Sequence, residues 1–289
     1  MVEATRQPVR VSRRVFVVGN GMTRFMKPGK HAFDYHELSK LAIERALRDA
    51  GITYDKVQQA YASYVYGDSC SGQLAIYSTG MTGIPVFNIN NNGATGGTGI
   101  YMASRAVASG AADCVLSVGF EKMYKGPLKE FFTDRASPVE NFLKHNLALR
   151  GDEGKKAWAV KLFADAGREH MEKYGTTLEH FAKVAEKNHR HASNNTNSSF
   201  RKIYSLQEIK DSPMIHSPVQ LLACCPNSDG AAAAIMCSED FVRKHGLEDQ
   251  AVEISGISLV TDTPNTFGRS MIDLIGGTMS KRAAEEACR

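Results

Sequence analysis

The chain has 289 residues, of which 43% are hydrophobic and 23% are charged. This composition excludes a wholly disordered chain, and at roughly 150 residues per domain the length predicts about two domains. Lys and Arg exceed Asp and Glu by 35 to 31, a net charge of +4, which is too small and too dispersed to indicate a nucleic-acid-binding surface. No apolar stretch reaches the ~20 residues of a membrane span, and the N-terminus lacks the apolar run of a secretory signal.

Strand and helix signals alternate along the first part of the chain. Residues 15–18 form a short β-branched run that predicts a buried strand, and Gly19-Asn20-Gly21 predicts the turn that ends it. Apolar side chains recur at helical spacing over residues 35–50, and Gly51 is a suitable C-terminal cap. Residues 100–109, apolar on nearly every face, predict a buried helix. Further strands are expected at residues 57–65, 84–89 and 112–120.

The character of the chain changes between residues 121 and 218. Charged residues become dense, strand signals vanish, and amphipathic patterns predict helices at residues 157–174 and 178–191. Strand signals return at residues 229–237 and 252–260. The alternation of strands and helices outside this segment predicts an α/β fold with helices on both faces of a mixed sheet, and the segment itself is expected to be an inserted cap.

Three motifs have a structural explanation that outweighs a functional one. The glycines after residues 15–18 resemble the start of a dinucleotide-binding fingerprint, but Arg24 stands where its third glycine belongs, so a plain strand and turn is the better prediction. His189 and His191 lack a third ligand, so surface histidines are expected and no metal site. The cysteines have no C-x-x-C spacing and are expected to be buried free thiols, although Cys224-Cys225 leaves proximity to a ligand pocket open.

The segment Asn90-Asn91-Asn92-Gly93-Ala94-Thr95-Gly96 lies between a predicted strand and the predicted buried helix. A helix N-terminus offers unpaired N–H groups and a partial positive charge, which stabilise an anion or a thiolate. This is a suitable position for a nucleophile or an oxyanion, but Gly93 has no side chain that could attack a substrate.

Several longer stretches follow the pattern of one known family. They are Gly21-Met22-Thr23-Arg24-Phe25-Met26-Lys27-Pro28, Tyr64-Val65-Tyr66-Gly67-Asp68-Ser69, Gly119-Phe120-Glu121-Lys122-Met123, Glu169-His170-Met171-Glu172-Lys173-Tyr174-Gly175 and Cys224-Cys225-Pro226 with Ser228-Asp229-Gly230. In these stretches the chain resembles the thiolase domain of the sterol carrier protein X, or SCP2-thiolase, family. The resemblance extends over nearly the whole chain from Arg14.

The resemblance implies a thiolase-like α/β fold of two similar βαβαβαββ halves, of which this chain holds one, with a mixed five-stranded sheet and an inserted, mostly helical loop domain. The implied reaction is thiolysis of a 3-oxoacyl-CoA by free coenzyme A (CoA), or the reverse condensation, with CoA and acyl-CoA as substrates and no cofactor. The implied parts are a flexible arm over residues 1–13, an N-terminal core over 14–120 and 219–265, the loop domain over 121–218, and the start of a truncated second half over 266–289.

The implied chemistry needs a cysteine thiolate that becomes acylated, a histidine that lowers its pKa, a second cysteine and oxyanion-binding N–H groups. The resemblance places the family's nucleophile at Gly93 and the other reactive groups in a second half, which we expect this chain, ending at Arg289, to lack. We therefore expect a member of an acyl-CoA C-acyltransferase family that is inactive as given. The resemblance places substrate-binding positions at Asn92, Ala94, Met123, Cys225 and Ser228.

Two other functions stay open, namely a non-catalytic module that binds acyl-CoA or dimerises, and an inert truncated fragment. The resemblance implies a homodimer, or a heterodimer with a complete thiolase, formed through the strand at residues 85–90. It also implies a role in peroxisomal lipid and sterol side-chain metabolism, although Ala287-Cys288-Arg289 is not a peroxisomal Ser-Lys-Leu signal. Since no targeting signal is visible, mitochondrion and cytoplasm stay open as locations.

Overall fold

The computed structural model describes residues 13–126, 128, 131–151 and 158–289. These residues form two compact units, each assembled from separate stretches of the chain. Unit 1 contains the described residues up to Tyr124 with Ser228–Leu259 and Glu286–Arg289, and unit 2 contains those of Lys125–Asn227 and Val260–Glu285. The domain boundaries expected from the sequence stay a prediction, because compactness alone does not show that a unit folds independently. The expected arm at residues 1–13 lies, except for Arg13, outside the described residues.

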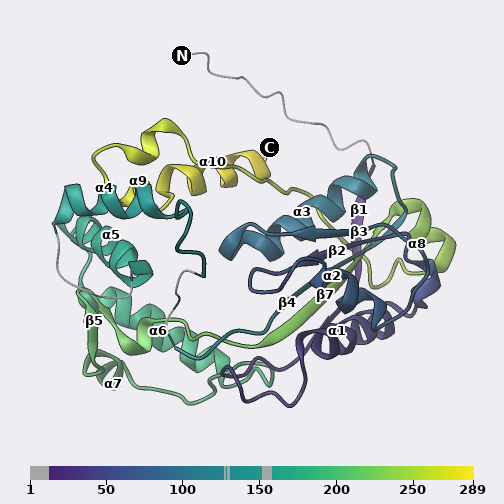
Figure 1. Ribbon diagram of the computed structural model, residues 1–289, viewed down its shortest axis with the longest axis horizontal. Coiled ribbons are helices and arrows are strands. Elements are labelled where there is room, and N and C mark those ends of the chain that lie inside the picture. Colours follow the sequence, from purple (N-terminus) through teal and green to yellow (C-terminus); the bar gives the residue numbers. More distant parts are fainter. Residues whose placement is uncertain (1–12, 127, 129–130, 152–157) are drawn as a thin grey trace. The chain divides into compact units, whose positions relative to one another are not determined.

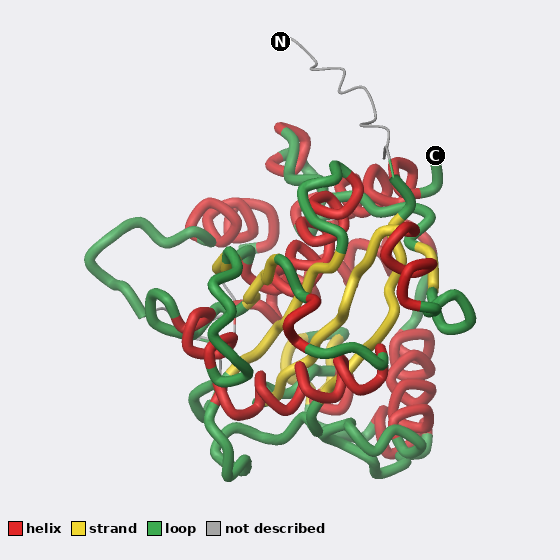
Figure 2. Tube along the Cα trace, turned by 90° about the vertical axis from the view of Figure 1, so that its right-hand side faces the viewer, coloured by secondary structure: helices red, strands yellow, loops and turns green. Residues whose placement is uncertain are grey.

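Unit 1 is built around a mixed β-sheet, whose strands Figure 2 shows in yellow. The strands are β1 (Val15–Met22), β2 (Gln59–Ser63), β3 (Val86–Ile89), β4 (Cys114–Glu121), β7 (Gly230–Ser238) and β8 (Val252–Glu253). They lie in the order β3-β2-β4-β7-β1-β8. β2 is parallel to β3 and β4, whereas β7 is antiparallel to β4 and β1. The expected count of five strands was wrong for the described residues, because the first two residues of the predicted strand 252–260 pair with the open edge of β1 as a sixth strand.

Helices cover both faces of this sheet, as expected (Figure 1). They are α1 (Tyr35–Ala50), α2 (Ser71–Tyr77), α3 (Thr95–Ala108) and α8 (Glu239–His245). Successive side chains of a strand point to opposite faces, and β4 uses both. Its Leu116 and Val118 belong to the same core as Ile43 of α1, whereas Val115 packs in a second core with Val107 of α3. The central strands of the sheet are therefore covered by α1 on one face and by α3 on the other.

Two glycines in β1 allow α1 to pack directly against the backbone of the strand. A Cβ atom at Gly19 would lie 2.4 Å from the carbonyl oxygen of Ala46, and one at Gly21 would lie 2.2 Å from that of Ala42. No side chain fits at such distances. The turn expected at these glycines was wrong, since β1 continues through them to Met22. Their role in the described structure is close packing of a helix on a strand.

Unit 2 is mainly helical. It contains α4 (Glu140–Arg150), α5 (Trp158–Tyr174), α6 (Leu178–Ala192), α7 (Leu206–Lys210), α9 (Met271–Leu274), most of α10 (Gly277–Ala287), and a hairpin of β5 (Met214–His216) and β6 (Val219–Gln220). The helices expected at residues 157–174 and 178–191 are confirmed as α5 and α6, with residue 157 outside the described residues. Unit 2 also contains the short 3₁₀ helices η3 (Leu221–Ala223) and η4 (Pro264–Phe267), and unit 1 contains two others, η1 (Tyr54–Lys56) and η2 (Asn92–Ala94).

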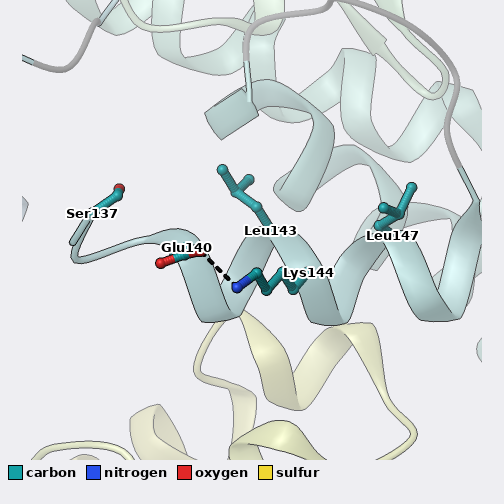
Figure 3. Close-up of a pocket in the computed structure, with 5 residues that line it drawn as sticks. All are labelled: Ser137, Glu140, Leu143, Lys144 and Leu147. Atoms are coloured by element: carbon teal, nitrogen blue, oxygen red, sulfur yellow. Dashed lines mark ion pairs between the residues drawn. The ribbon is translucent and has the colours of Figure 1, made fainter. Parts of the chain in front are cut away.

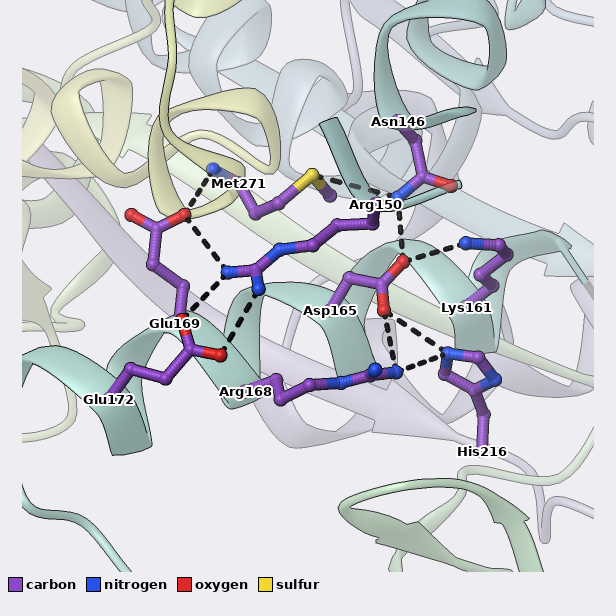
Figure 4. Close-up of polar contacts among 9 residues, drawn as sticks. All are labelled: Asn146, Arg150, Lys161, Asp165, Arg168, Glu169, Glu172, His216 and Met271. Atoms are coloured by element: carbon purple, nitrogen blue, oxygen red, sulfur yellow. Dashed lines mark hydrogen bonds and ion pairs between the residues drawn. The ribbon is translucent and has the colours of Figure 1, made fainter. Parts of the chain in front are cut away.

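A fully buried carboxylate, Asp165 of α5, lies at the centre of a polar network in unit 2 (Figure 4). It accepts hydrogen bonds from Asn146 Nδ2 at 2.7 Å and Lys161 Nζ at 2.8 Å. Arg168 lies 3.0 Å and His216 Nε2 lies 3.1 Å from its Oδ1. Burial alone would raise the pKa of Asp165, but the hydrogen bonds from Lys161, Asn146 and His216 outweigh it and lower that pKa below its ordinary value. The charged carboxylate therefore ties α4, α5 and β5 together.

Candidate functional site

The site predicted from the sequence lies at one edge of the sheet of unit 1. The parallel strands β2, β3 and β4 present their carboxyl ends at the same edge. β1 ends there too, since it and β4 are both antiparallel to β7, and β7 begins there at Gly230. Ligands of open α/β sheets bind outside the carboxyl ends of the strands. We refer to this side of unit 1 as the carboxyl edge.

Position 93 lies at the carboxyl edge, between β3 and α3. Gly93 is the middle residue of η2 and is exposed to solvent. A Cβ atom built on it meets no atom within 4 Å, and its φ is outside the left-handed region. Neither space nor backbone conformation therefore requires a glycine here. The preceding Asn92 has φ 46°, in the left-handed region that asparagine tolerates better than most residues.

Hydrogen bonds among Asn and Thr side chains hold the turn that carries position 93. Thr95 Oγ1 donates to the carbonyl oxygen of Asn92 at 2.6 Å and accepts from the N–H of Asn91 at 2.8 Å. Asn91 Nδ2 donates to Thr98 Oγ1 at 2.9 Å, and Asn90 Oδ1 accepts from the N–H of Asn92 at 3.1 Å. The run of three asparagines is thus explained by the turn. The N-cap residue of α3 is an alanine, which makes no capping hydrogen bond, so the first N–H groups of α3 are not capped by that side chain.

α3 packs closely on the sheet because Gly99 faces two serines. A Cβ atom at Gly99 would lie 2.3 Å from Ser63 Oγ of β2 and 3.0 Å from Ser117 Oγ of β4. The absence of a side chain at Gly99 therefore sets the position of the helix whose N-terminus follows residue 93. This close approach explains Gly99 alone among the glycines of α3, because a Cβ atom at Gly96 or Gly97 would meet nothing within 4 Å.

Two acidic residues organise the carboxyl edge next to β4 and β7. Asp229 is fully buried, and its carboxylate accepts hydrogen bonds from the N–H groups of Met123 at 2.7 Å and Gly29 at 3.2 Å. Glu121 Oε1 accepts from the N–H groups of Val65 at 2.7 Å and Tyr66 at 3.3 Å. Each carboxylate thereby joins loops that lie far apart in the sequence.

Burial raises the pKa of Glu121 above its ordinary value. The two backbone N–H groups oppose this rise, and the nearby charge of Asp229 adds to it. The analysis of the sequence did not single out either carboxylate. A signal was present, since each acidic residue lies at the end of an apolar strand, one position after Phe120 and one before Gly230.

The structure brings together some of the predicted substrate-binding positions and not others. Asn92 and Ala94 flank position 93 in η2, and Met123 and Ser228 adjoin Asp229 at the same carboxyl edge. Cys225 belongs to unit 2 and is exposed. The substrate-binding role of these five residues stays a prediction.

The expectation of buried thiols is correct for Cys114 and Cys237, which face each other across β4 and β7. It is wrong for Cys70, Cys225 and Cys288, which are exposed because they lie in loops or at the chain end rather than in the apolar strands. Cys224 is intermediate, and burial raises the pKa of its thiol.

Unit 2 contains a surface hollow that holds none of the predicted site residues (Figure 3). It has a volume of about 340 Å³ and is lined on α4 by Leu143 and Leu147, with Ser137, Glu140 and Lys144 at its polar side. Glu140 and Lys144 form an ion pair across one turn of the helix. In the part of the chain that the structure describes, no three His, Cys, Asp or Glu side chains gather closely enough for a metal ion. Across the same residues, no helix combines the length and apolar character needed to cross a bilayer.

Comparison with known proteins identifies the family to which this chain belongs. A family model of the thiolase N-terminal domain matches residues 15–217. The chain belongs to the thiolase family. Sterol carrier protein 2 of Bos taurus is 52% identical to this thiolase chain over 283 residues, which cover 97% of the chain and 52% of the relative. Non-specific lipid-transfer protein-like 2 of Caenorhabditis elegans is 42% identical over 279 residues, which cover 94% of the chain and 68% of the relative. The chain spans about half the length of the sterol carrier protein 2 relatives.

Solved structures confirm the expected thiolase-like α/β fold. Human mitochondrial 3-ketoacyl-CoA thiolase superimposes with a TM-score of 0.68 at 18% identity, over 96% of this chain and 77% of that one. A chain of the structure titled Ltp2-ChsH2(DUF35) aldolase superimposes with a TM-score of 0.64 at 26% identity, over 80% of this chain and 57% of that one. The first likeness shows the fold alone.

Proposed function

We propose that this chain supplies the N-terminal part of a thiolase-type acyl-CoA site and does not itself catalyse thiolysis. The observation that carries the proposal is Gly93, an exposed and unobstructed position at the start of α3. By the family resemblance, this position belongs to the cysteine that becomes acylated. With glycine there, the chain offers backbone but no thiolate.

The loss of the nucleophile affects chemistry and binding differently. Thiolysis requires a covalent acyl-enzyme, and removal of a catalytic nucleophile typically lowers the rate by orders of magnitude. The N–H groups of the first turn of α3 do not depend on the side chain at residue 93. They can still stabilise a carbonyl oxygen or a carboxylate. The chain is therefore expected to retain ligand binding after losing turnover.

The names of two relatives, sterol carrier protein 2 and non-specific lipid-transfer protein-like 2, support a lipid or sterol ligand. From the family resemblance we propose that this ligand is a CoA thioester of a lipid or sterol side chain, handled in the peroxisome. The loop domain implied by the resemblance would shape the pocket for CoA. Cys225, Met123 and Ser228 are the positions we propose to contact the substrate.

We further propose that the chain dimerises through β3, with itself or with a complete thiolase. β3 is an outermost strand of the sheet, so one of its edges has no strand partner among the described residues. Its Phe87 is 46% exposed and stacks on Tyr61 of β2. An open edge strand that carries an exposed aromatic side chain favours pairing with another chain.

Two measurements on the purified chain test the function. Incubation with a 3-oxoacyl-CoA and free CoA is expected to yield no thiolysis above a control without protein. Calorimetric titration with CoA is expected to release binding heat. Clear turnover would overturn the claim of inactivity, whereas absence of both turnover and binding heat at millimolar CoA would favour an inert fragment.

A second candidate is cleavage of a carbon–carbon bond in a 3-hydroxyacyl-CoA. Two observations favour it, namely the glycine at position 93 and the likeness to the chain titled as an aldolase. A retro-aldol step needs a base to take the hydroxyl proton and a group that stabilises the enolate oxygen, but no thiol nucleophile. Release of a ketone or aldehyde from a 3-hydroxyacyl-CoA, without consumption of free CoA, would select this candidate over a binding module.

A further inference from the structure

A second feature of the carboxyl edge is the loop of residues 23–33 between β1 and α1, which we call the basic loop. Its sequence contains Arg24, Lys27 and Lys30 and no acidic residue. All three cationic side chains are exposed, and none of them forms an ion pair in the described part of the chain. The loop therefore presents three uncompensated positive charges to solvent.

The basic loop is held in one conformation by contacts along its length. Met26 exchanges two backbone hydrogen bonds with Asp229, at 3.0 and 2.7 Å, and the carboxylate of Asp229 accepts from the N–H of Gly29. His31 Nε2 donates to the carbonyl oxygen of Arg24 at 2.7 Å. Lys122 Nζ donates to the carbonyl oxygen of Phe33 at 2.6 Å. A preorganised loop loses little conformational entropy when a partner binds.

The acidic groups nearest to the loop in the sequence and structure are already engaged. Asp34 caps α1 and accepts from the N–H of Tyr35, while Glu37 accepts from the N–H of Asp34. Asp229 is fully buried and accepts from two N–H groups. None of these carboxylates forms an ion pair with Arg24, Lys27 or Lys30 among the described residues. The three exposed cations outnumber the two exposed carboxylates, Asp34 and Glu37, so this surface keeps a net positive charge that favours an anionic partner.

Apolar side chains flank these charges. Met22, at the end of β1, is 41% exposed, and Phe33, at the end of the loop, is 44% exposed. Cations beside exposed apolar side chains are typical of proteins that lie on a membrane surface, where the cations meet anionic head groups and the apolar side chains enter the interface. We propose that the basic loop docks this protein onto an anionic lipid surface. The proposal does not depend on the thioester chemistry at position 93.

Co-sedimentation of the whole chain with extruded vesicles tests this. We expect binding to vesicles that contain phosphatidylserine and none to pure phosphatidylcholine. Since the Debye length shrinks from about 10 Å at 0.1 M salt to about 3 Å at 1 M, the binding should be lost at high salt. Each cation near such a surface strengthens partitioning about fivefold, so the double variant Lys27→Glu/Lys30→Glu should bind at least about 25-fold more weakly.

A matched control carries the same change in net charge at the opposite edge of the sheet. Lys56 precedes β2 and Lys244 lies in α8, which follows β7, so Lys56→Glu/Lys244→Glu should bind vesicles like the wild type. Phe33→Ala should weaken binding while leaving its salt dependence unchanged. Circular dichroism verifies that each variant is folded.

Equal binding to both kinds of vesicle, equal loss in both double variants, or no vesicle binding at all would overturn the proposal. Salt-sensitive binding to soluble polyglutamate, without vesicle binding, would assign the basic loop to an acidic protein partner instead.

Discussion

At the scale of single residues, the carboxyl edge combines a missing side chain with two organising carboxylates. Gly93 leaves the start of α3 without a reactive group, although the surroundings would accept one. Glu121 and Asp229 instead hold backbone N–H groups of neighbouring loops. The loops of the edge are therefore held in place around a position where, in the function we propose, no nucleophile is present.

Glu121→Gln tests the consequence of burying a carboxyl group. Burial raises the pKa of Glu121 in the folded chain. The stabilisation that comes from binding this proton is therefore fully present below the unfolded-state pKa and is lost as pH rises through the folded-state pKa. The amide keeps an oxygen for the N–H groups of Val65 and Tyr66 and cannot ionise. We expect the variant to exceed the wild type in free energy of unfolding at pH 7 and to match it near pH 4, as measured by urea titration.

Glu121→Ala is the matched control, since it removes the acceptor altogether. It should be less stable than the wild type by about 1–3 kcal/mol at either pH, because two partly buried N–H groups lose their partner. A wild type that gains stability over Glu121→Gln between pH 4 and pH 7 would contradict the raised pKa.

At the scale of elements, close packing of backbone on backbone determines the positions of the helices. α1 rests on Gly19 and Gly21 of β1, and α3 rests on Gly99 against Ser63. In unit 2 the polar network of Asp165 joins α4, α5 and β5. These contacts link segments that are distant in the sequence, so periodicity predicts the elements but not their mutual approach.

Gly21→Ala places a Cβ atom against the backbone of α1 and should destabilise the chain by at least about 3 kcal/mol, the upper range of overpacking costs. Gly97→Ala is the control, because a Cβ atom there meets nothing within 4 Å and alanine favours a helix over glycine by about 0.5–1 kcal/mol. The midpoint temperature of thermal unfolding should therefore fall in Gly21→Ala and rise in Gly97→Ala. Equal shifts of this temperature in the two variants would refute the packing of α1 on β1.

Asp165→Asn leaves Lys161 and Arg168 without their buried counter-charge and should destabilise the chain by about 3–5 kcal/mol at pH 7. The lowered pKa of Asp165 means that its contribution is present above the ordinary carboxyl pKa and is lost as pH falls through the folded pKa. The difference in free energy of unfolding between the wild type and Asp165→Asn should therefore become smaller at acidic pH.

Glu186→Gln is the control, because it breaks the more exposed ion pair with Arg190. It should lower the free energy of unfolding by less than about 1 kcal/mol. A similar loss of stability in both variants would argue against a stabilising network around Asp165.

At the scale of the whole molecule, the sequence predicted more of the fold than of the site. Short apolar runs located the main strands, and helical spacing of apolar side chains located α1, α5 and α6, whereas α3 was located as a segment that is apolar on nearly every face. Asp165 lies on the buried stripe of α5 beside Leu162 and Ala166, and this misplaced charge was an unused signal. Glu121 and Asp229 could not be assigned partners, since their N–H donors come from separate loops.

The proposed dimer can be tested by light scattering on a size-exclusion column. We expect twice the 31.6 kDa mass of one chain. Phe87→Glu, on the edge strand β3, should yield a monomer because charge on an open edge opposes pairing. Val252→Glu changes a side chain that is 67% exposed on the opposite edge strand β8 and should leave the dimer intact. A monomeric wild type would exclude pairing through β3.

The central claim is that position 93 is a nucleophile position that lacks its nucleophile. The most direct measurement installs a thiol there and follows its alkylation by iodoacetamide against pH, with peptide-resolved mass spectrometry to separate it from the exposed Cys70, Cys225 and Cys288. Ser109→Cys, at the exposed C-terminal end of the same helix, is the control. The N-terminus of α3 should lower the thiol pKa of Gly93→Cys below that of Ser109→Cys by roughly half a unit or more. Equal pKa values, or a higher one at position 93, would contradict the claim.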